Sequence, residues 1–239
     1  MNNTILPDAF PADAITFTTA GNNGTLISII LDESGSMISC LNPTIEGFNE
    51  YVSGQRNSPE AGQVYMSLTK FDAPNIKIEY VNKPISEVPE LSRHNYKPNG
   101  GTNLFDAIGN TINNVEGVLS KIPEQAQRPA VIVVIMTDGH ENSSREYSAN
   151  TIKKMVSAAE SAEWLFLFIG ANIDSFAAGS AIGMTVANTA SYDVNDIKGM
   201  YASLNNSTTA MRSAKMAGTS TASVYASGAA VSGFANKGE

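Results

Sequence analysis

The sequence is short of cysteine, of positive charge and of long apolar stretches. Its 239 residues include a single cysteine, Cys40, which excludes an internal disulfide framework and cysteine-based zinc sites. There are 15 basic and 23 acidic residues, a net charge of −8, and no Lys/Arg run occurs. Binders of nucleic acid or of anionic membranes need a basic footprint, so we expect neither partner. No apolar run approaches the roughly 20 residues of a bilayer span.

What is present favours a folded domain. Apolar residues make up 42% of the chain, enough for a sizeable core, and the length fits one large α/β domain better than two small ones. The first residues, MNNTILPDAFPADAITF, show neither the basic nor the apolar region of a secretory signal. We therefore expect a cytoplasmic protein.

Short apolar runs alternate with stretches of helical character. Residues 25–31, 131–136 and 164–169 are apolar throughout, as expected for strands buried on both faces. Residues 63–71 and 76–81 alternate around the turn sequence DAPN, which predicts a hairpin whose second strand lies at a sheet edge. Helices are predicted over residues 43–54, 103–121, 146–161, 174–182 and 193–214.

Strands that alternate with helices predict a doubly wound α/β fold, with a mostly parallel sheet covered on both faces and one antiparallel edge strand. The core domain is predicted to span residues 23–214. Residues 1–22 are irregular and rich in Pro, Asn and Thr, which indicates an N-terminal arm. Residues 215–239 are dominated by Ala, Ser and Gly, which favours a mobile tail. A small-residue helix that docks on a partner is the alternative.

Polar side chains follow the predicted buried strands. Asp32, Ser34 and Ser36 come after the first strand, Thr102 precedes the helix at 103, and Asp138 follows the strand at 131–136. Loops at the carboxyl ends of parallel strands open on one edge of the sheet. Two carboxylates and three hydroxyls suit Mg²⁺, Mn²⁺ or Ca²⁺ and disfavour zinc or copper. The competing interpretation is that these are ordinary helix caps and turn residues.

The runs LDESGSM, GGTNLFDAIGNTI and VIVVIMTDGHENSS resemble the von Willebrand factor A (VWA) domain, in particular its stand-alone bacterial and phage-type members. The resemblance covers about residues 24–214. The metal-ion-dependent adhesion site (MIDAS) of that family uses a DxSxS motif, a threonine and an aspartate. The matching positions here are Asp32, Ser34, Ser36, Thr102 and Asp138.

The resemblance implies that the two serines bind a cation directly, that the aspartates act partly through water, and that Thr102 joins or leaves the coordination shell. It also implies that a carboxylate of a partner protein fills the position that faces solvent. In many family members ligand binding shifts the last helix. An AAA+ ATPase or a component of a stress or defence system is the expected kind of partner by analogy with relatives.

Several nearby residues invite assignment. Glu33 is expected to point away from the site, toward solvent or into a supporting position. Asp106 either hydrogen-bonds a metal-bound water or caps its helix. Asp72 is expected to be a turn residue, and His140 and Glu141 to be solvated at the mouth of the site.

We expect a metal-dependent protein-interaction module that acts as an adaptor or subunit of a cytoplasmic assembly, and not an enzyme. The sequence has no nucleotide-binding loop and no nucleophile elbow. Two alternatives stay open: a metal-dependent hydrolase, and a structural component of a larger particle in which the metal only stabilises the fold.

Overall fold

A seven-stranded sheet with the order β1-β4-β3-β2-β5-β6-β7 organises the protein. The structure is a computed structural model that describes residues 4–5, 24–58, 63–122, 128–171, 175–184, 186–192 and 196–230. The strands are β1 (Thr4–Ile5), β2 (Thr25–Asp32), β3 (Val64–Asp72), β4 (Asn75–Pro84), β5 (Ala130–Thr137), β6 (Leu165–Ala171) and β7 (Thr189–Tyr192). Strands β3, β2, β5, β6 and β7 run parallel, and β4 runs antiparallel to β3. The predicted doubly wound, mostly parallel sheet is confirmed.

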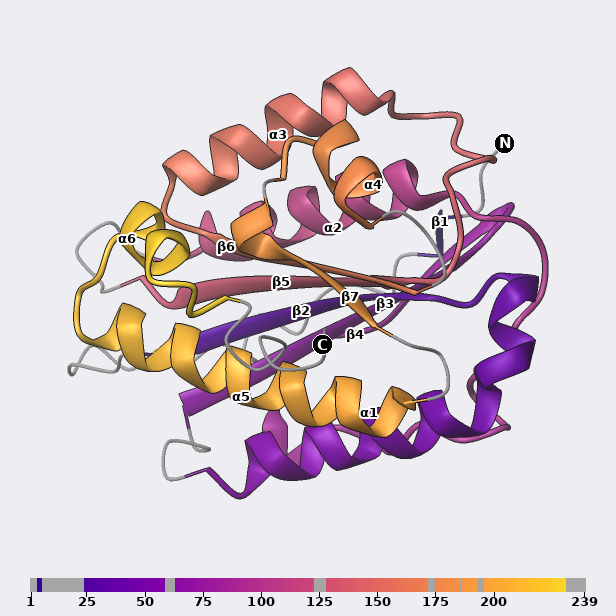
Figure 1. The fold of residues 1–239 in the computed structure, drawn as a ribbon, viewed down its shortest axis with the longest axis horizontal. Helices are drawn as coiled ribbons and strands as arrows, with labels where there is room; N and C mark the ends of the chain where they lie inside the picture. The colour runs from indigo at the N-terminus through magenta and orange to yellow at the C-terminus, as the bar shows by residue number, and fades with distance from the viewer. Residues whose placement is uncertain are drawn as a thin grey trace, which may run out of the picture.

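Helices cover both faces of the sheet (Figure 1). Helices α1 (Leu41–Arg56) and α5 (Ile197–Met216) cover one face, and α2 (Leu104–Leu119), α3 (Ala149–Ser161) and α4 (Ser175–Ala181) cover the other. Short 3-10 helices η1 (Gly35–Cys40), η3 (Ile85–Glu87) and η4 (Val186–Asn188) occur in connections, and α6 (Thr221–Ala226) follows α5. Within the described residues no helix has the length and apolarity needed to cross a membrane.

The central strand shows why the apolar runs do not alternate. Every residue of β2 is buried, because successive side chains enter two different cores. Ile27 and Ile29 face the core under α1 and α5, whereas Leu26 and Ile30 face the core under α2 and α3. Burial on both faces leaves the strand ends as the place where polar side chains can gather.

The antiparallel strand is not the outermost strand of the sheet. The sequence predicts β4 at the edge, but the two-residue β1 pairs with it in parallel, with Thr4 opposite Ile76 and Ile5 opposite Lys77. This pairing also gives part of the predicted irregular arm a regular structure. The other residues of the 1–22 segment lie outside the described residues.

The prediction of a mobile tail from residue 215 is wrong as far as the structure describes it. Helix α5 continues to Met216, and α6 follows with Ser220 as its N-cap, whose side chain accepts a hydrogen bond from the Ser223 N–H. Val224 and Ala230 are fully buried in the core under α1 and α5. A few well-placed apolar groups therefore anchor a segment whose average composition is that of a linker. Residues 231–239 lie outside the described residues.

We expect Tyr225→Phe to lower the free energy of unfolding by about 1–2 kcal/mol, because the buried Phe166 N–H would lose its acceptor. The Tyr225 hydroxyl accepts that hydrogen bond at 2.8 Å. Urea denaturation measures the change. Ala222→Ser, which adds a hydroxyl on the exposed side of α6, is the matched control and should change stability by no more than about 0.5 kcal/mol. Equal stability of Tyr225→Phe and the wild type would show that this contact does not anchor α6.

Candidate metal centre

Asp32 lies at the end of β2 and is completely buried. Its Oδ1 accepts a hydrogen bond from the Ser34 N–H at 2.7 Å, and its Oδ2 accepts one from the Thr137 hydroxyl at 2.5 Å. Thr137 is the last residue of the neighbouring strand β5. The adjacent strand ends therefore hold the carboxylate in one orientation.

The hydroxyls of the DxSxS motif connect Asp32 to the next strand. Ser34 Oγ and Ser36 Oγ lie 3.1 Å apart, and the Ser36 hydroxyl donates to Asp138 Oδ1 at 2.6 Å. Ser34 is buried, Asp138 is half-buried and Ser36 is exposed. The group of oxygens is consequently closed on the Asp32 side and open to solvent on the Ser36 side.

Thr102 reaches the same point from the loop before α2. A Cβ built on Gly139 would lie 3.0 Å from Thr102 Oγ1, 3.7 Å from Ser36 Oγ and 3.9 Å from Asp32 Oδ2. These three oxygens come from two separate segments, the DxSxS loop and the loop before α2, and with Gly139 they surround one small space that a methyl group would fill. The structure brings together all five predicted ligands, Asp32, Ser34, Ser36, Thr102 and Asp138.

The loop after β5 is bonded to the Thr102 loop through contacts that the sequence did not indicate. Asn142 Oδ1 accepts from the Thr102 N–H at 3.0 Å, and Thr102 O accepts from the Asn142 N–H at 3.0 Å and the Ser143 N–H at 3.1 Å. Glu141, expected to be solvated, instead accepts from the Phe105 N–H in the first turn of α2 at 2.9 Å. Glu141 therefore helps to fix the position of Thr102.

Asp106 has a structural role that neither sequence interpretation described. It is 2% exposed, and its carboxylate accepts hydrogen bonds from the N–H groups of Arg145, Glu146 and Tyr147 at 2.8–2.9 Å. These three donors belong to the loop that connects Asp138 to α3. Asp106 holds this loop against α2, so it supports the site from behind. Asp72 is a turn residue as predicted, because its carboxylate accepts from the Asn75 amide at 2.9 Å.

The folded structure disfavours the ionised forms of the two carboxylates of the site, Asp32 and Asp138. Burial raises the pKa of Asp32 to about 6, although hydrogen bonds from Thr137 and Ser34 oppose the shift. Burial also raises the pKa of Asp138, and the charge of Asp138 contributes to the raised pKa of Asp32. A cation between the two carboxylates would remove this cost.

The donor set decides which ion the site fits. Within the described part of the chain, no group of three or more His, Cys, Asp or Glu side chains could hold a metal. A metal centre there would need ligands of another kind, such as hydroxyl or main-chain oxygens. The connected set of two carboxylates and three hydroxyls supplies such oxygens, which hard divalent cations prefer as ligands. The residues therefore fit a divalent cation.

Comparisons with known proteins give a match at the level of structure. No protein-family model and no curated protein matches the sequence. Proximal thread matrix protein 1 (PTMP1) from the mussel byssus aligns over 77% of this chain and 48% of its own, at 13% identity and a TM-score of 0.54. The pilus adhesin SpaC from Lactobacillus rhamnosus GG, in its open conformation, aligns over 80% of this chain and 30% of its own, at 11% identity and a TM-score of 0.59. The fold is that of a VWA domain.

A second structure of PTMP1 has a zinc-occupied MIDAS motif; it aligns over 75% of this chain and 44% of its own, at 13% identity and a TM-score of 0.52. This chain spans less than half the length of PTMP1 and about a third of the adhesin. At such identities the likeness shows the VWA fold alone. The placement of the five candidate ligands rests on the geometry of this chain.

Proposed function

We propose that this VWA domain binds a protein partner through a divalent cation held by Asp32, Ser34, Ser36, Thr102 and Asp138. When bound, the cation supplies an electrophilic position for a carboxylate of the partner. The partner side chain is an Asp or Glu, and the domain serves as an adaptor or subunit of a cytoplasmic assembly. The partner that we propose is an AAA+ ATPase or a component of a defence or stress system.

The observation that carries the proposal is the continuous contact from Asp32 through Ser34 and Ser36 to Asp138. Those contacts join two strand ends that are far apart in the sequence, and they leave the Ser36 side exposed. With three of five ligands uncharged, a bound divalent cation keeps an affinity for a further anion. A partner carboxylate could approach from the exposed side without any change in the buried side.

The structural neighbours support a binding role. They are a thread matrix protein and a pilus adhesin, and their names describe no enzymatic reaction. The zinc-occupied MIDAS of PTMP1 supports a divalent cation at the corresponding motif and makes zinc a necessary test ion. The oxygen ligands favour Mg²⁺, with Mn²⁺ and Ca²⁺ as the next candidates.

Metal-dependent thermal stability tests the first half of the proposal. Mg²⁺, Mn²⁺, Ca²⁺ or Zn²⁺ is added to EDTA-treated protein, and the melting temperature should rise with ion concentration. At 100 times the dissociation constant the gain corresponds to about 2.7 kcal/mol. Asp32→Ala should show no rise. If the wild type does not respond to any of the four ions, the proposal is wrong.

Partner capture tests the second half. Immobilised domain should retain its partner in Mg²⁺ and release it in EDTA, and Asp32→Ala should retain nothing under either condition. A partner that stays bound in EDTA, and binds equally to Asp32→Ala, would contradict a carboxylate–cation contact. In that case the metal would only stabilise the fold.

We expect Gly139→Ala to weaken Mg²⁺ binding at least tenfold while all five ligands remain, because the new methyl group would occupy the space between Thr102, Ser36 and Asp32. Isothermal titration calorimetry measures the affinity. Gly117→Ala on α2 is the matched control, since its Cβ would meet nothing within 4 Å. The control should bind Mg²⁺ like the wild type and gain up to about 1 kcal/mol of stability. Unchanged affinity in Gly139→Ala would place the cation elsewhere.

A further inference from the structure

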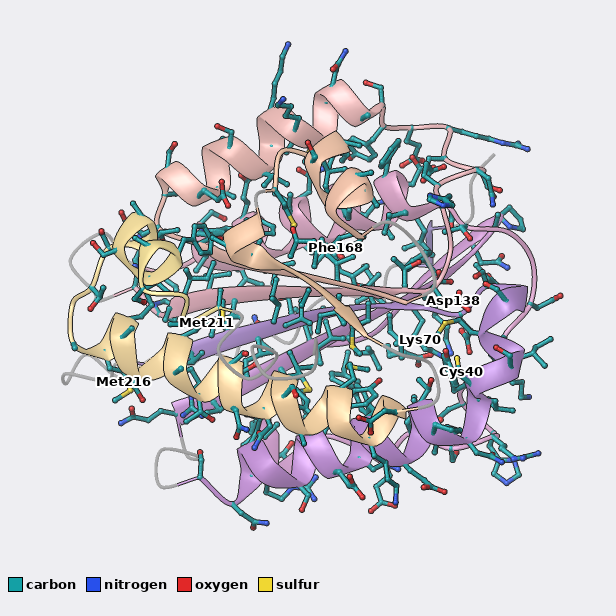
Figure 2. All side chains as sticks on the ribbon, viewed as in Figure 1. Cys40, Lys70, Asp138, Phe168, Met211 and Met216 are labelled. Carbon is teal, nitrogen blue, oxygen red and sulfur yellow. The ribbon has the colours of Figure 1, made fainter. Side chains whose placement is uncertain are left out.

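A buried lysine lies directly behind the metal-binding loop. Lys70 belongs to β3, is 3% exposed and pairs in register with Leu31, one residue before Asp32. Figure 2 shows Lys70 at the same end of the sheet as Asp138. Its ammonium group contacts Glu33 Oε1 at 3.1 Å and Glu79 Oε1 at 2.7 Å, and it also donates to the main-chain oxygen of Asn95.

Lys70 compensates the charge of two carboxylates, Glu33 and Glu79, and Glu33 relies on it more than Glu79 does. Glu79 keeps a second cation, because Lys77 Nζ lies 2.8 Å from the same oxygen. Among the described residues, the ion pair of Glu33 is with Lys70. Glu33 stands between two proposed ligands in the DxSxS motif, yet its side chain turns away from them toward β3, as the alternation along an extended segment requires.

Glu33 also holds the segment that leads to Thr102. Its Oε1 accepts the Lys97 N–H as well as the Lys70 ammonium, and its main-chain oxygen accepts the Asn99 N–H at 2.8 Å. The Gly35 N–H then donates to Gly100 O at 3.1 Å. The DxSxS loop is therefore joined directly to Lys97, Asn99 and Gly100, the last of them two residues before Thr102, and indirectly to Asn95 through Lys70.

Gly100, which joins the Thr102 loop to the DxSxS loop, has a backbone conformation and a close packing that favour glycine at this position. Its φ is +68°, and a Cβ there would lie 2.4 Å from Ala73 O. The Ala73 N–H donates to Gly101 O at 2.8 Å. The loop is fixed on the β3 side by these main-chain contacts and on the DxSxS side by Glu33, so a change at Glu33 would be transmitted toward Thr102 rather than absorbed by a flexible segment.

We propose that Glu33 and Lys70 are positioning residues of the cation site, which set the placement of Thr102 relative to Ser34 and Ser36 by holding residues 95–100 against the DxSxS loop. The inference rests on the proposed metal function. It assigns Glu33 a role as a hydrogen-bond acceptor, and it does not require the negative charge of Glu33. Supporting residues that orient metal ligands typically change affinity by 10–100-fold when they are removed.

Two substitutions at Glu33 separate position from charge. Glu33→Gln keeps the Oε1 that accepts from Lys70 and from the Lys97 N–H, whereas Glu33→Ala removes it. We expect the Mg²⁺ dissociation constant to rise at least tenfold in Glu33→Ala and by less than about threefold in Glu33→Gln. Calorimetric titration of the metal-free proteins with Mg²⁺ gives both values. Hydrogen exchange of residues 95–102 without metal should accelerate in Glu33→Ala and stay unchanged in Glu33→Gln.

Lys70→Met adds the other half of the test. It should weaken Mg²⁺ binding to the same extent as Glu33→Ala, and the double variant should be no weaker than either one. Lys77→Met is the control, because Lys77 is 53% exposed and pairs with Glu79; its affinity should equal that of the wild type. Should Lys70→Met fail to fold, the two Glu33 variants decide the question alone.

Three results would overturn the inference. Equal losses in Glu33→Gln and Glu33→Ala, with tighter binding in Lys70→Met, would show that Glu33 acts through its charge. Wild-type affinity in Glu33→Ala would remove the positioning role and leave the metal function intact. A wild-type protein that binds no Mg²⁺, Mn²⁺, Ca²⁺ or Zn²⁺ would reject the metal function itself, and the inference would fail with it.

Discussion

Asp32→Asn should make the metal-free protein more stable and abolish its response to divalent cations. Asp32 is completely buried, and burial raises its pKa to about 6 from 3.8. The ionised form therefore costs about 2–3 kcal/mol in the folded state. Asparagine keeps the shape and removes the charge, since its Nδ2 can donate to Thr137 Oγ1. We expect the melting temperature at pH 7 without metal to rise by roughly 5 °C, and Mg²⁺ to cause no further rise.

The pH dependence provides the control for this result. The folded pKa of Asp32 lies above the unfolded value, so protonation favours the folded state and the cost is complete only above about pH 6. As the pH falls from 7 to 4, the metal-free wild type should gain stability relative to Asp32→Asn until the two melt alike. A stability difference that stays constant over that range would contradict desolvation of Asp32 as its cause.

Asp106→Ala should produce the largest loss of stability among these variants, at least about 3 kcal/mol, because three main-chain N–H groups would lose one shared acceptor. Those donors are Arg145, Glu146 and Tyr147, and the Asp106 side chain is 2% exposed. Urea denaturation of the metal-free protein gives the change in unfolding free energy. Asp106→Asn should lose less, since it keeps the oxygen that accepts two of the three hydrogen bonds.

Glu116→Ala is the matched control for Asp106→Ala, because Glu116 lies on the exposed side of the same helix. It should change stability by no more than about 0.5 kcal/mol. If Asp106→Ala were as mild as Glu116→Ala, the loop from Asp138 to α3 would be held by other contacts. The carboxylate of Asp106 would then have no essential part in supporting the site.

The five longest strands and the five main helices could be predicted because their signals are local and repeated. Residues 25–31 show the apolar run of a doubly buried strand, and the structure extends this strand only to Asp32. Helix α5 was predicted over 193–214 and runs from Ile197 to Met216. The prediction of a mobile tail failed because the average composition of a segment does not show which single residues are buried in the core. Val224 and Ala230 are small, and only the tertiary structure shows that they are fully buried.

The candidate metal site also has features that the sequence predicts and features that it does not. The placement of Asp32 and Asp138 at one end of the sheet could be predicted because each follows a recognisable buried strand, and the polar loop residues together with the resemblance to VWA domains gave the candidate ligand set. The contacts that fix these ligands could not be predicted. Thr137 bonds to Asp32 across 105 positions and Asn142 bonds to Thr102 across 40. Such pairs depend on which strand ends become neighbours, and a single sequence carries no signal of that.

The contact of Tyr225 with Phe166 has a consequence for how the molecule can associate with others. Strand β7 pairs with β6 from Phe168 to Ala171, so the beginning of β6 extends beyond its neighbour. The Tyr225 hydroxyl takes the position of a strand carbonyl there, because it accepts the Phe166 N–H. An extended peptide that paired with the beginning of β6 at this edge would first have to displace α6. Helix α6 thus protects the sheet against growth by strand addition, a common route to aggregation for proteins with open edges.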